Sequence, residues 1–387
     1  MFVFLKKISP LFLMILIAVG FYLYKQKDNY IKGNEINIVQ FADVSGFNAQ
    51  RTLNFDYGVE AYFRNLNENG GVGGRKVIFR KIDNKGEKDL SLDKIYEIKD
   101  TVASFFGFVD FYTSKVVLET AAGENRPFLM PFCSADFLKR EYERFYYSFT
   151  PSIEDEIDAL LEYLASRDIK SFCILYEDDI CMRNLVKEVK NMAKDKRMDV
   201  EESLFYKKNT YLFSDIYKRL SELSPKAVLV LGSYKEISVF LKKISNDIVF
   251  SGTFFLIPSY IGIDAFSENF KNDRDINLIF SQPVFSPFED KFHIVKEYRK
   301  VFKKYYPKKE FGFDSLKGYL YAKIFSLAME SARKEISGKK ILYFLKNIPY
   351  IKYNRENLIE ILNENGTLNK VYLFRYKEGK LFEMDAG

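Results

Sequence analysis

The chain has 387 residues, enough for two or three domains, and its 47% hydrophobic and 29% charged residues are typical of a globular protein with a full core. Its net charge of +6 comes from lysines interspersed with acidic residues, without a basic block, which argues against a nucleic-acid partner. One histidine, His293, and three cysteines, Cys133, Cys173 and Cys181, fit no zinc pattern, so we expect no metal and no other cofactor.

Residues 1–28 are predicted to be an export signal or a short membrane anchor. Lys6 and Lys7 precede an apolar run over residues 11–24, and Lys25 and Lys27 follow it. Cleavage and anchoring both stay open. In either case the rest of the chain is expected in the periplasm or at the outer face of the inner membrane.

Short apolar strands then alternate with amphipathic helices. The first series predicts strands at 36–42, 75–83, 102–109, 127–132 and 145–149, with helices at 53–66, 89–100 and 113–125. The second series predicts helices at 154–167, 182–195, 213–222 and 235–245, with strands at 171–177, 200–206, 226–232, 247–255 and 277–285. Helices at 290–304, 314–335 and 338–346 follow, and the chain closes with an antiparallel hairpin at 370–376 and 380–384.

This alternation predicts parallel sheets that are covered by helices on both faces. The strands are too many for one sheet, and the pattern restarts near residue 150. Two doubly wound α/β domains are therefore expected. Ligands of such folds bind beyond the carboxyl ends of the strands, which places the site in the cleft between the domains.

The glycine-rich stretch "NENGGVGGRK" at 67–76 is not expected to bind phosphate. A phosphate loop follows a strand and precedes a helix, whereas this stretch follows a predicted helix and precedes a predicted strand. The glycines instead predict a helix end and a tight turn, since glycine accepts positive φ without a steric cost.

An ordered set of residues resembles the type I periplasmic solute-binding proteins of the leucine/branched-chain amino acid receptor group. The family's first helix and second strand are matched in order and spacing by Ser45-Gly46, Gly58, Asn67, Gly70-Gly71, Gly74-Arg75 and Asp83. The stretches 105–138, 311–332 and 361–380 resemble its later segments. The likeness covers about residues 36 to 384.

The resemblance implies two lobes joined by three crossovers, with lobe 1 at 36–147 plus 283–350 and lobe 2 at 148–282 plus 351–387. Such receptors close on a small solute, deliver it to the membrane subunits of an ABC importer, and catalyse nothing. A membrane-anchored sensory protein that passes closure to a signalling partner is the alternative. An enzyme is disfavoured because the chain has no Gly-x-Ser-x-Gly elbow and its histidine falls on a helix face.

In the first lobe, the resemblance places a ligand carboxylate at the loop before the helix at 113–125. Tyr112 and Thr113 would donate hydrogen bonds there, and Thr113 would also cap the helix. Cys133 and Ser134 fall at the family's second carboxylate segment, where Cys133 would form a small neutral wall; the alternative is that Cys133 is simply buried. Arg51 is either a ligand-facing cation or a solvated turn residue.

In the second lobe, the resemblance places Tyr234 and Cys181 against the ligand. Phe254 is matched to the acid that amino acid receptors carry just after a strand to neutralise the ligand's ammonium. Because an ammonium buried without a partner is costly, this match favours an apolar or aromatic carboxylate or an amide. The acids at 177–179 are the alternative ammonium partners. A disulfide between Cys173 and Cys181 is conceivable, but a buried Cys173 thiol fits its strand better.

Overall fold

A computed structural model of the chain describes residues 14–15, 31–32, 34–46, 49–85, 88–98, 102, 104–107, 111–123, 128–129, 134–245, 247–264, 266, 276–347, 362, 368, 370–377 and 380–384. The predicted signal or anchor therefore lies almost entirely outside the described residues. Within these ranges, no helix has the length and apolar character needed to cross a bilayer.

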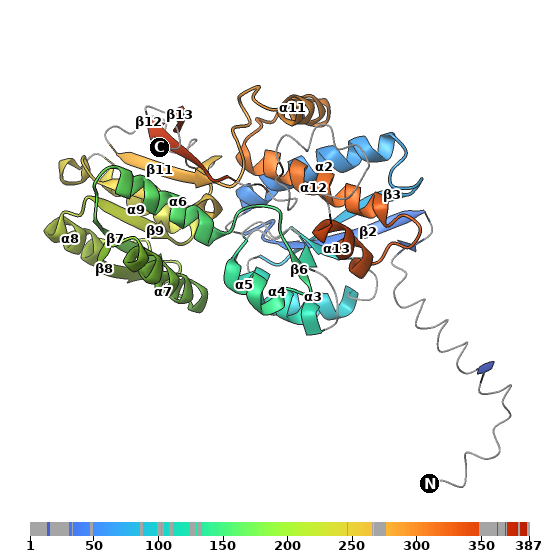
Figure 1. Cartoon of the computed structure of the whole chain (residues 1–387), viewed down its shortest axis with the longest axis horizontal. Coiled ribbons are helices and arrows are strands. Elements are labelled where there is room, and N and C mark those ends of the chain that lie inside the picture. The colour runs from blue at the N-terminus through green and yellow to red at the C-terminus, as the bar shows by residue number, and fades with distance from the viewer. Residues whose placement is uncertain are drawn as a thin grey trace, which may run out of the picture.

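The described chain forms two α/β lobes that lie side by side (Figure 1). The elements of the first lobe up to the first crossover are β1 (Ile31–Lys32), β2 (Glu35–Ala42), α2 (Ala49–Glu68), β3 (Lys76–Asp83), α3 (Lys88–Ile98), β4 (Phe105–Phe106), α4 (Phe111–Gly123), β5 (Phe128–Leu129), α5 (Asp136–Tyr142) and β6 (Tyr146–Tyr147). Its later elements are α11 (His293–Tyr305), α12 (Phe313–Ser331) and α13 (Gly338–Lys346).

The second lobe lies between these two sets in the sequence and is completed by the C-terminal hairpin. Its elements are α6 (Ile153–Ser166), β7 (Ser171–Glu177), α7 (Ile180–Asp195), β8 (Asp199–Tyr206), α8 (Ser214–Leu223), β9 (Ala227–Leu231), α9 (Tyr234–Ile244), the 3-10 turn η2 (Ile248–Phe250), β10 (Phe254–Ile257), the 3-10 turn η3 (Ser259–Ile261), β11 (Asn277–Gln282), β12 (Tyr372–Lys377) and β13 (Lys380–Met384).

Both sheets share one strand order. Parallel strands run β3-β2-β4-β5-β6 in the first lobe and β8-β7-β9-β10-β11 in the second, and the antiparallel hairpin β12-β13 extends the second sheet beyond β11. Each order reverses once, between β2 and β4 and between β7 and β9. In open α/β sheets this reversal is where a ligand crevice forms. The predicted fold class is confirmed.

Three crossovers join the lobes. One connects β6 to α6, one connects β11 to α11, and one connects α13 to β12. The lobe boundaries at 147/148, 282/283 and 350/351 stay a prediction.

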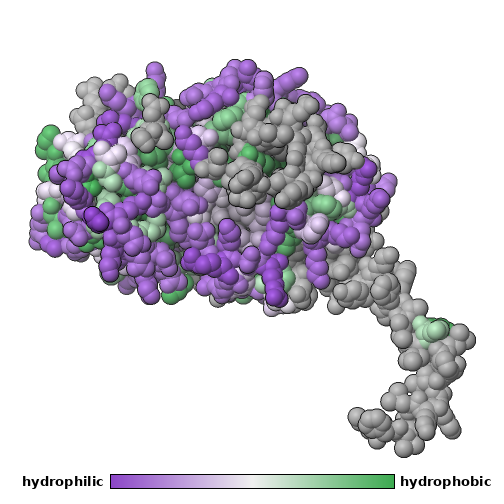
Figure 2. All heavy atoms as spheres, viewed as in Figure 1, coloured by the Kyte–Doolittle hydropathy of each residue, from purple (hydrophilic) through white to green (hydrophobic). Residues whose placement is uncertain are grey.

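Apolar residues cover both faces of each sheet, as parallel sheets require. The core on one face includes α2, α12, α8 and α9, and the core on the other includes α4, α6 and α7. The outer surface visible in Figure 2 is largely hydrophilic over both lobes, with hydrophobic residues scattered among the polar ones.

The glycine-rich turn has the structure that its sequence predicts. Helix α2 ends at Glu68, and Gly70, Gly71, Gly73 and Gly74 all have positive φ. The amide of Gly71 donates to Leu66 O at 2.9 Å, which closes the helix end.

The strand predicted at 247–255 is wrong in its first half. Residues 248–250 form η2, where Asp247 Oδ1 accepts a hydrogen bond from Val249 N at 3.0 Å, and the strand starts only at Phe254. Helix α5 was not predicted. The closing hairpin and the three helices before it are confirmed, with boundaries shifted by a few residues.

The first crossover ends at a capping box, which gives a first prediction. Ser152 Oγ accepts from Asp155 N at 3.1 Å, and Asp155 Oδ2 accepts from Ser152 N at 2.8 Å. We expect Ser152→Ala to lower the free energy of unfolding by about 1 kcal/mol, because an orphan N–H at the start of α6 loses its acceptor. Urea unfolding followed by circular dichroism measures this, and an unchanged midpoint would contradict it.

Candidate functional site

Predicted contact residues of both lobes flank the two points where the strand order reverses. Arg51 lies in the first turn of α2, which follows β2, and Tyr112 and Thr113 lie in the first turn of α4, which follows β4. Cys181 lies in the first turn of α7, which follows β7, and Tyr234 begins α9, which follows β9. The candidate site is therefore the region between the carboxyl ends of these strands.

Arg51 is buried and contacts the other lobe. Its side chain donates from Nη1 to Tyr260 O and from Nη2 to Ser259 O, the latter at 3.4 Å. Its Nη2 also lies 3.7 Å from Asp314 Oδ1 at the start of α12. Since Arg51 is only 3% exposed, its interpretation as a solvated turn residue is wrong. The guanidinium joins the lobes.

Ser134 faces the interior of its own lobe. Its hydroxyl accepts a hydrogen bond from Tyr146 OH at 3.1 Å, and its carbonyl accepts from Ile153 N at 2.7 Å. Ser134 thus ties the first lobe to the start of α6. Cys133 lies outside the described residues, and of Tyr112 and Thr113 the structure describes the helical backbone only.

Cys181 and Tyr234 differ in their surroundings. The Cys181 side chain is 1% exposed and packs in the core, while its backbone N–H donates to Asp179 Oδ1 at 2.6 Å. Tyr234 is partly buried, and its ring meets Phe266 edge-on with centroids 5.2 Å apart. No disulfide joins Cys181 and Cys173, and burial raises the pKa of the Cys173 thiol to about 11.

Phe254 is misplaced by the sequence analysis. It begins β10, and its ring packs against Tyr163 near the end of α6, with centroids 5.9 Å apart. The carboxyl end of β10 leads instead to Ser259 and Tyr260, the residues that accept hydrogen bonds from Arg51. The position just after the strand therefore belongs to residues 258–260, and any partner of a ligand ammonium at this strand would lie there.

A buried acid close to this position was missed. Glu156 in α6 accepts hydrogen bonds from Ser259 N (2.8 Å), Ser259 Oγ (2.7 Å) and Ser281 Oγ (2.6 Å). Burial raises the pKa of this carboxyl, although the serine hydrogen bonds and the nearby ammonium of Lys317 act against the rise. The sequence carries only a weak signal, since three of the four helix neighbours of Glu156 at three- and four-residue spacing are apolar and the fourth is Ser152.

The acids considered as alternative ammonium partners all have protein partners. Glu177 accepts from Ser233 N at 3.2 Å and also from its hydroxyl. Asp178 Oδ1 pairs with Arg183 Nε at 2.7 Å, and Asp179 caps α7. Burial raises the pKa of Glu177, with the Ser233 hydrogen bond opposing it. These contacts hold the loops at the end of β7 and β9 in place.

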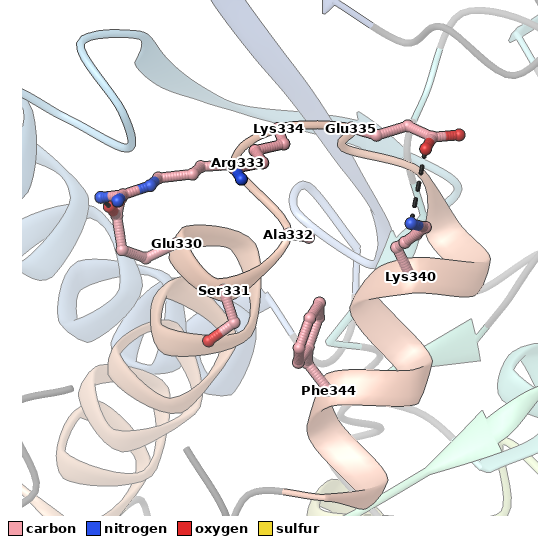
Figure 3. Close-up of a pocket in the computed structure, with 8 residues that line it drawn as sticks. All are labelled: Glu330, Ser331, Ala332, Arg333, Lys334, Glu335, Lys340 and Phe344. Atoms are coloured by element: carbon pink, nitrogen blue, oxygen red, sulfur yellow. Dashed lines mark hydrogen bonds and ion pairs between the residues drawn. The ribbon is translucent and has the colours of Figure 1, made fainter. Parts of the chain in front are cut away.

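A hollow of about 420 Å³ lies elsewhere on the first lobe, at the turn between α12 and α13 (Figure 3). Four of its charged side chains are paired, Glu330 with Arg333 at 2.8 Å and Glu335 with Lys340 at 3.4 Å. Arg75, in the turn that leads into β3, donates to Arg333 O at 3.0 Å, so the hollow lies beside the amino end of β3 and away from the cleft. No group of three metal-ligating side chains occurs in the described part of the chain.

Two lobes with one repeated strand order agree with the comparison to known families. Residues 35–380 match the sequence model of the family described as "Periplasmic binding protein". The chain belongs to the periplasmic binding protein family. It is a solute-binding protein of the type I fold and not an enzyme. No curated protein sequence matches the chain.

Solved structures of periplasmic binding proteins share this fold. A possible leucine/isoleucine/valine-binding protein from Rhodopirellula baltica SH 1 is 19% identical with a TM-score of 0.79, covering 91% of this chain and 97% of its own. A leucine-binding protein from Thermotoga maritima MSB8 is 15% identical with a TM-score of 0.74, covering 90% and 98%. A solute-binding protein of an ABC transporter from R. palustris, in complex with benzoate, is 14% identical with a TM-score of 0.74, covering 90% and 95%.

Proposed function

We propose that this protein is an exported receptor that closes on one small solute and delivers it to the membrane subunits of an ABC importer. The observation that carries the proposal is the strand-order reversal in each lobe, and we place the solute between the two reversals. A solute held there contacts both lobes and so stabilises their closed arrangement. Residues 1–28 direct export, with the cleaved and the anchored form as the two possible outcomes.

The ligand class we propose is a small carboxylate or amide, either an amino acid or an apolar or aromatic compound. The first turn of α4 supplies backbone N–H groups that lack intrahelical partners, and these suit a carboxylate. Pro258, Ser259 and Tyr260 follow β10 without an acid among them, and the nearby Glu156 is held by two serines. This arrangement favours a ligand without an ammonium. Benzoate and leucine in related proteins mark the range to be tested.

The test is a thermal-stability screen of the full chain in detergent against amino acids, amides, short-chain carboxylates and aromatic acids. A ligand at a hundred times its Kd stabilises the native state by about 2.7 kcal/mol, a rise of several degrees in Tm. We expect an aromatic or apolar carboxylate to give this rise. A rise with aliphatic amino acids alone would overturn the expectation of a ligand without an ammonium but keep the receptor.

Two tyrosine variants test whether Tyr234 contacts the ligand. Tyr234→Ala at the start of α9 is expected to reduce the ligand-induced shift, whereas Tyr343→Ala on the exposed side of α13, 62% exposed, is expected to leave it unchanged. Equal shifts in both variants would remove Tyr234 from the site. If no compound in the screen raises the Tm, the proposed delivery of these solutes is overturned and a signalling role is favoured.

A further inference from the structure

The chain that follows β10 in lobe 2 contacts two helices of lobe 1. On one side, Arg51 of α2 donates to the carbonyls of Ser259 and Tyr260. On the other side, Asp264 reaches the start of α12. The contacts are reciprocal, since lobe 1 gives a cation to lobe 2 and lobe 2 gives a carboxylate to lobe 1.

Asp264 caps a helix that has no side-chain cap of its own. Its Oδ1 accepts from Phe313 N at 3.1 Å, and its Oδ2 accepts from Asp314 N at 2.9 Å. The N-cap residue of α12 is Gly312, which has no side chain to offer. A Cβ at Gly312 would lie 2.5 Å from Asp264 Oδ2, so glycine is required for the carboxylate of the other lobe to enter.

A second carboxylate repeats this arrangement at the first crossover. Glu154 of α6 accepts from Asp136 N, the first residue of α5, at 3.0 Å. The N-cap residue of α5 is Ala135, which makes no side-chain cap. In both places, therefore, an acid of lobe 2 satisfies a backbone N–H of lobe 1 that its own lobe leaves unsatisfied.

We propose that Asp264 and Glu154 are positioning residues that set the angle between the two lobes when no solute is bound. Each carboxylate has to stay within hydrogen-bond distance of the opposite lobe, so together they restrict rotation about the crossovers. The inference rests on the two-lobed fold and holds whichever solute the cleft binds. The two carboxylates give the open and closed states a difference in free energy that does not depend on a bound solute.

The charges around each carboxyl support a role at a junction. Asp264 faces Asp314 of α12, Arg51 of α2 and Tyr298 of α11, and Glu154 faces Asp136 and Arg140 of α5. Burial raises the pKa of both carboxyls to about 7. Burying an ionised carboxylate between the lobes costs free energy, whereas water solvates it well. The stability of these hydrogen bonds therefore depends on how far apart the lobes lie.

Distances between spin labels on the two lobes test the proposal on the full chain in detergent, without ligand. Labels are placed at Lys94→Cys on α3 and Leu212→Cys before α8, whose side chains are 48% and 85% exposed. A Cys133→Ala background is used, and the other two cysteines, Cys173 and Cys181, are buried. Because no solute is added, failure of the proposed solute class leaves this measurement unaffected.

We expect Asp264→Ala and Glu154→Ala to lengthen and broaden the distance distribution. Glu154→Gln is expected to restore it, since its side-chain carbonyl accepts the same hydrogen bond. The matched control is Ser337→Ala, which removes a cap within lobe 1, where Ser337 Oγ accepts from Lys340 N at 3.4 Å. Distributions of the Asp264 and Glu154 variants that superimpose on the control would overturn the proposal. If Asp264→Ala does not fold, the two Glu154 variants decide alone.

Discussion

Replacing Gly318 with alanine is expected to lower the free energy of unfolding by about 3 kcal/mol, at the upper end of the range for an overpacked core. A Cβ at Gly318 would lie 2.1 Å from Phe55 O of α2, and a Cβ at Gly58 would lie 1.8 Å from Ser315 O of α12. The two helices therefore touch backbone to backbone at a pair of glycines. A methyl group cannot fit unless the helices separate, and backbone atoms cannot move aside as a flexible side chain can.

Urea unfolding followed by circular dichroism measures the loss. The matched control is Gly123→Ala at the end of α4, where an added Cβ meets nothing within 4 Å. This control is expected to leave stability unchanged or to raise it slightly, because alanine is the better helix former. Equal midpoints for Gly318→Ala and the control would show that α2 and α12 are not in this contact.

Stability is expected to fall as the pH rises from 5.5 to 8, by about 2 kcal/mol from Asp56 alone. Asp56 lies in α2 with a fully buried side chain, and burial raises its pKa to about 7, although Lys81 Nζ at 3.5 Å opposes the rise. The folded state thus holds the proton more tightly than the unfolded chain, where aspartate titrates near 4. Its contribution is full below about pH 4 and is lost as the pH rises through 7.

Asp56→Asn isolates this group, since an amide keeps the shape of the protonated acid and does not titrate. We expect the variant to be the more stable protein at both pH values, and its advantage in free energy of unfolding to grow by about 2 kcal/mol from pH 5.5 to pH 8. Urea unfolding at the two pH values makes the comparison. The same loss of stability in both proteins would assign the pH dependence to other groups, of which Asp264 and Glu154 come first.

The spacing of apolar residues and the positions of turn-forming residues were enough to predict most helices and strands from the sequence. The strand at 171–177 was predicted to the residue, because an apolar strand buried on both faces is bounded by polar residues at each end. The strand at 247–255 was wrong in its first half for a physical reason. Ile248 and Val249 have the composition of a strand but are 83% and 44% exposed, so the pattern marked residues that the fold does not bury.

The candidate site was harder to predict because its geometry depends on contacts between distant residues. An error of a few residues in the start of β10 placed Phe254 at the cleft, although the strand's other end reaches it. Arg51 was recognised as unusual, but its partners follow it by more than 200 positions. Asp264 and Glu154 gave no signal at all, since a missing cap in one lobe does not indicate which residue of the other lobe supplies it.

The place of the C-terminal hairpin has a consequence for how the protein is made. Strand β12 pairs along the length of β11 although about ninety residues separate them, and those residues include the last three helices of the first lobe. During synthesis the second lobe therefore keeps an open, apolar sheet edge until the end of the chain emerges. Such an edge invites pairing with another chain. A nascent chain that cannot finish its second lobe early also stays unfolded for longer, which is the form that an export channel accepts.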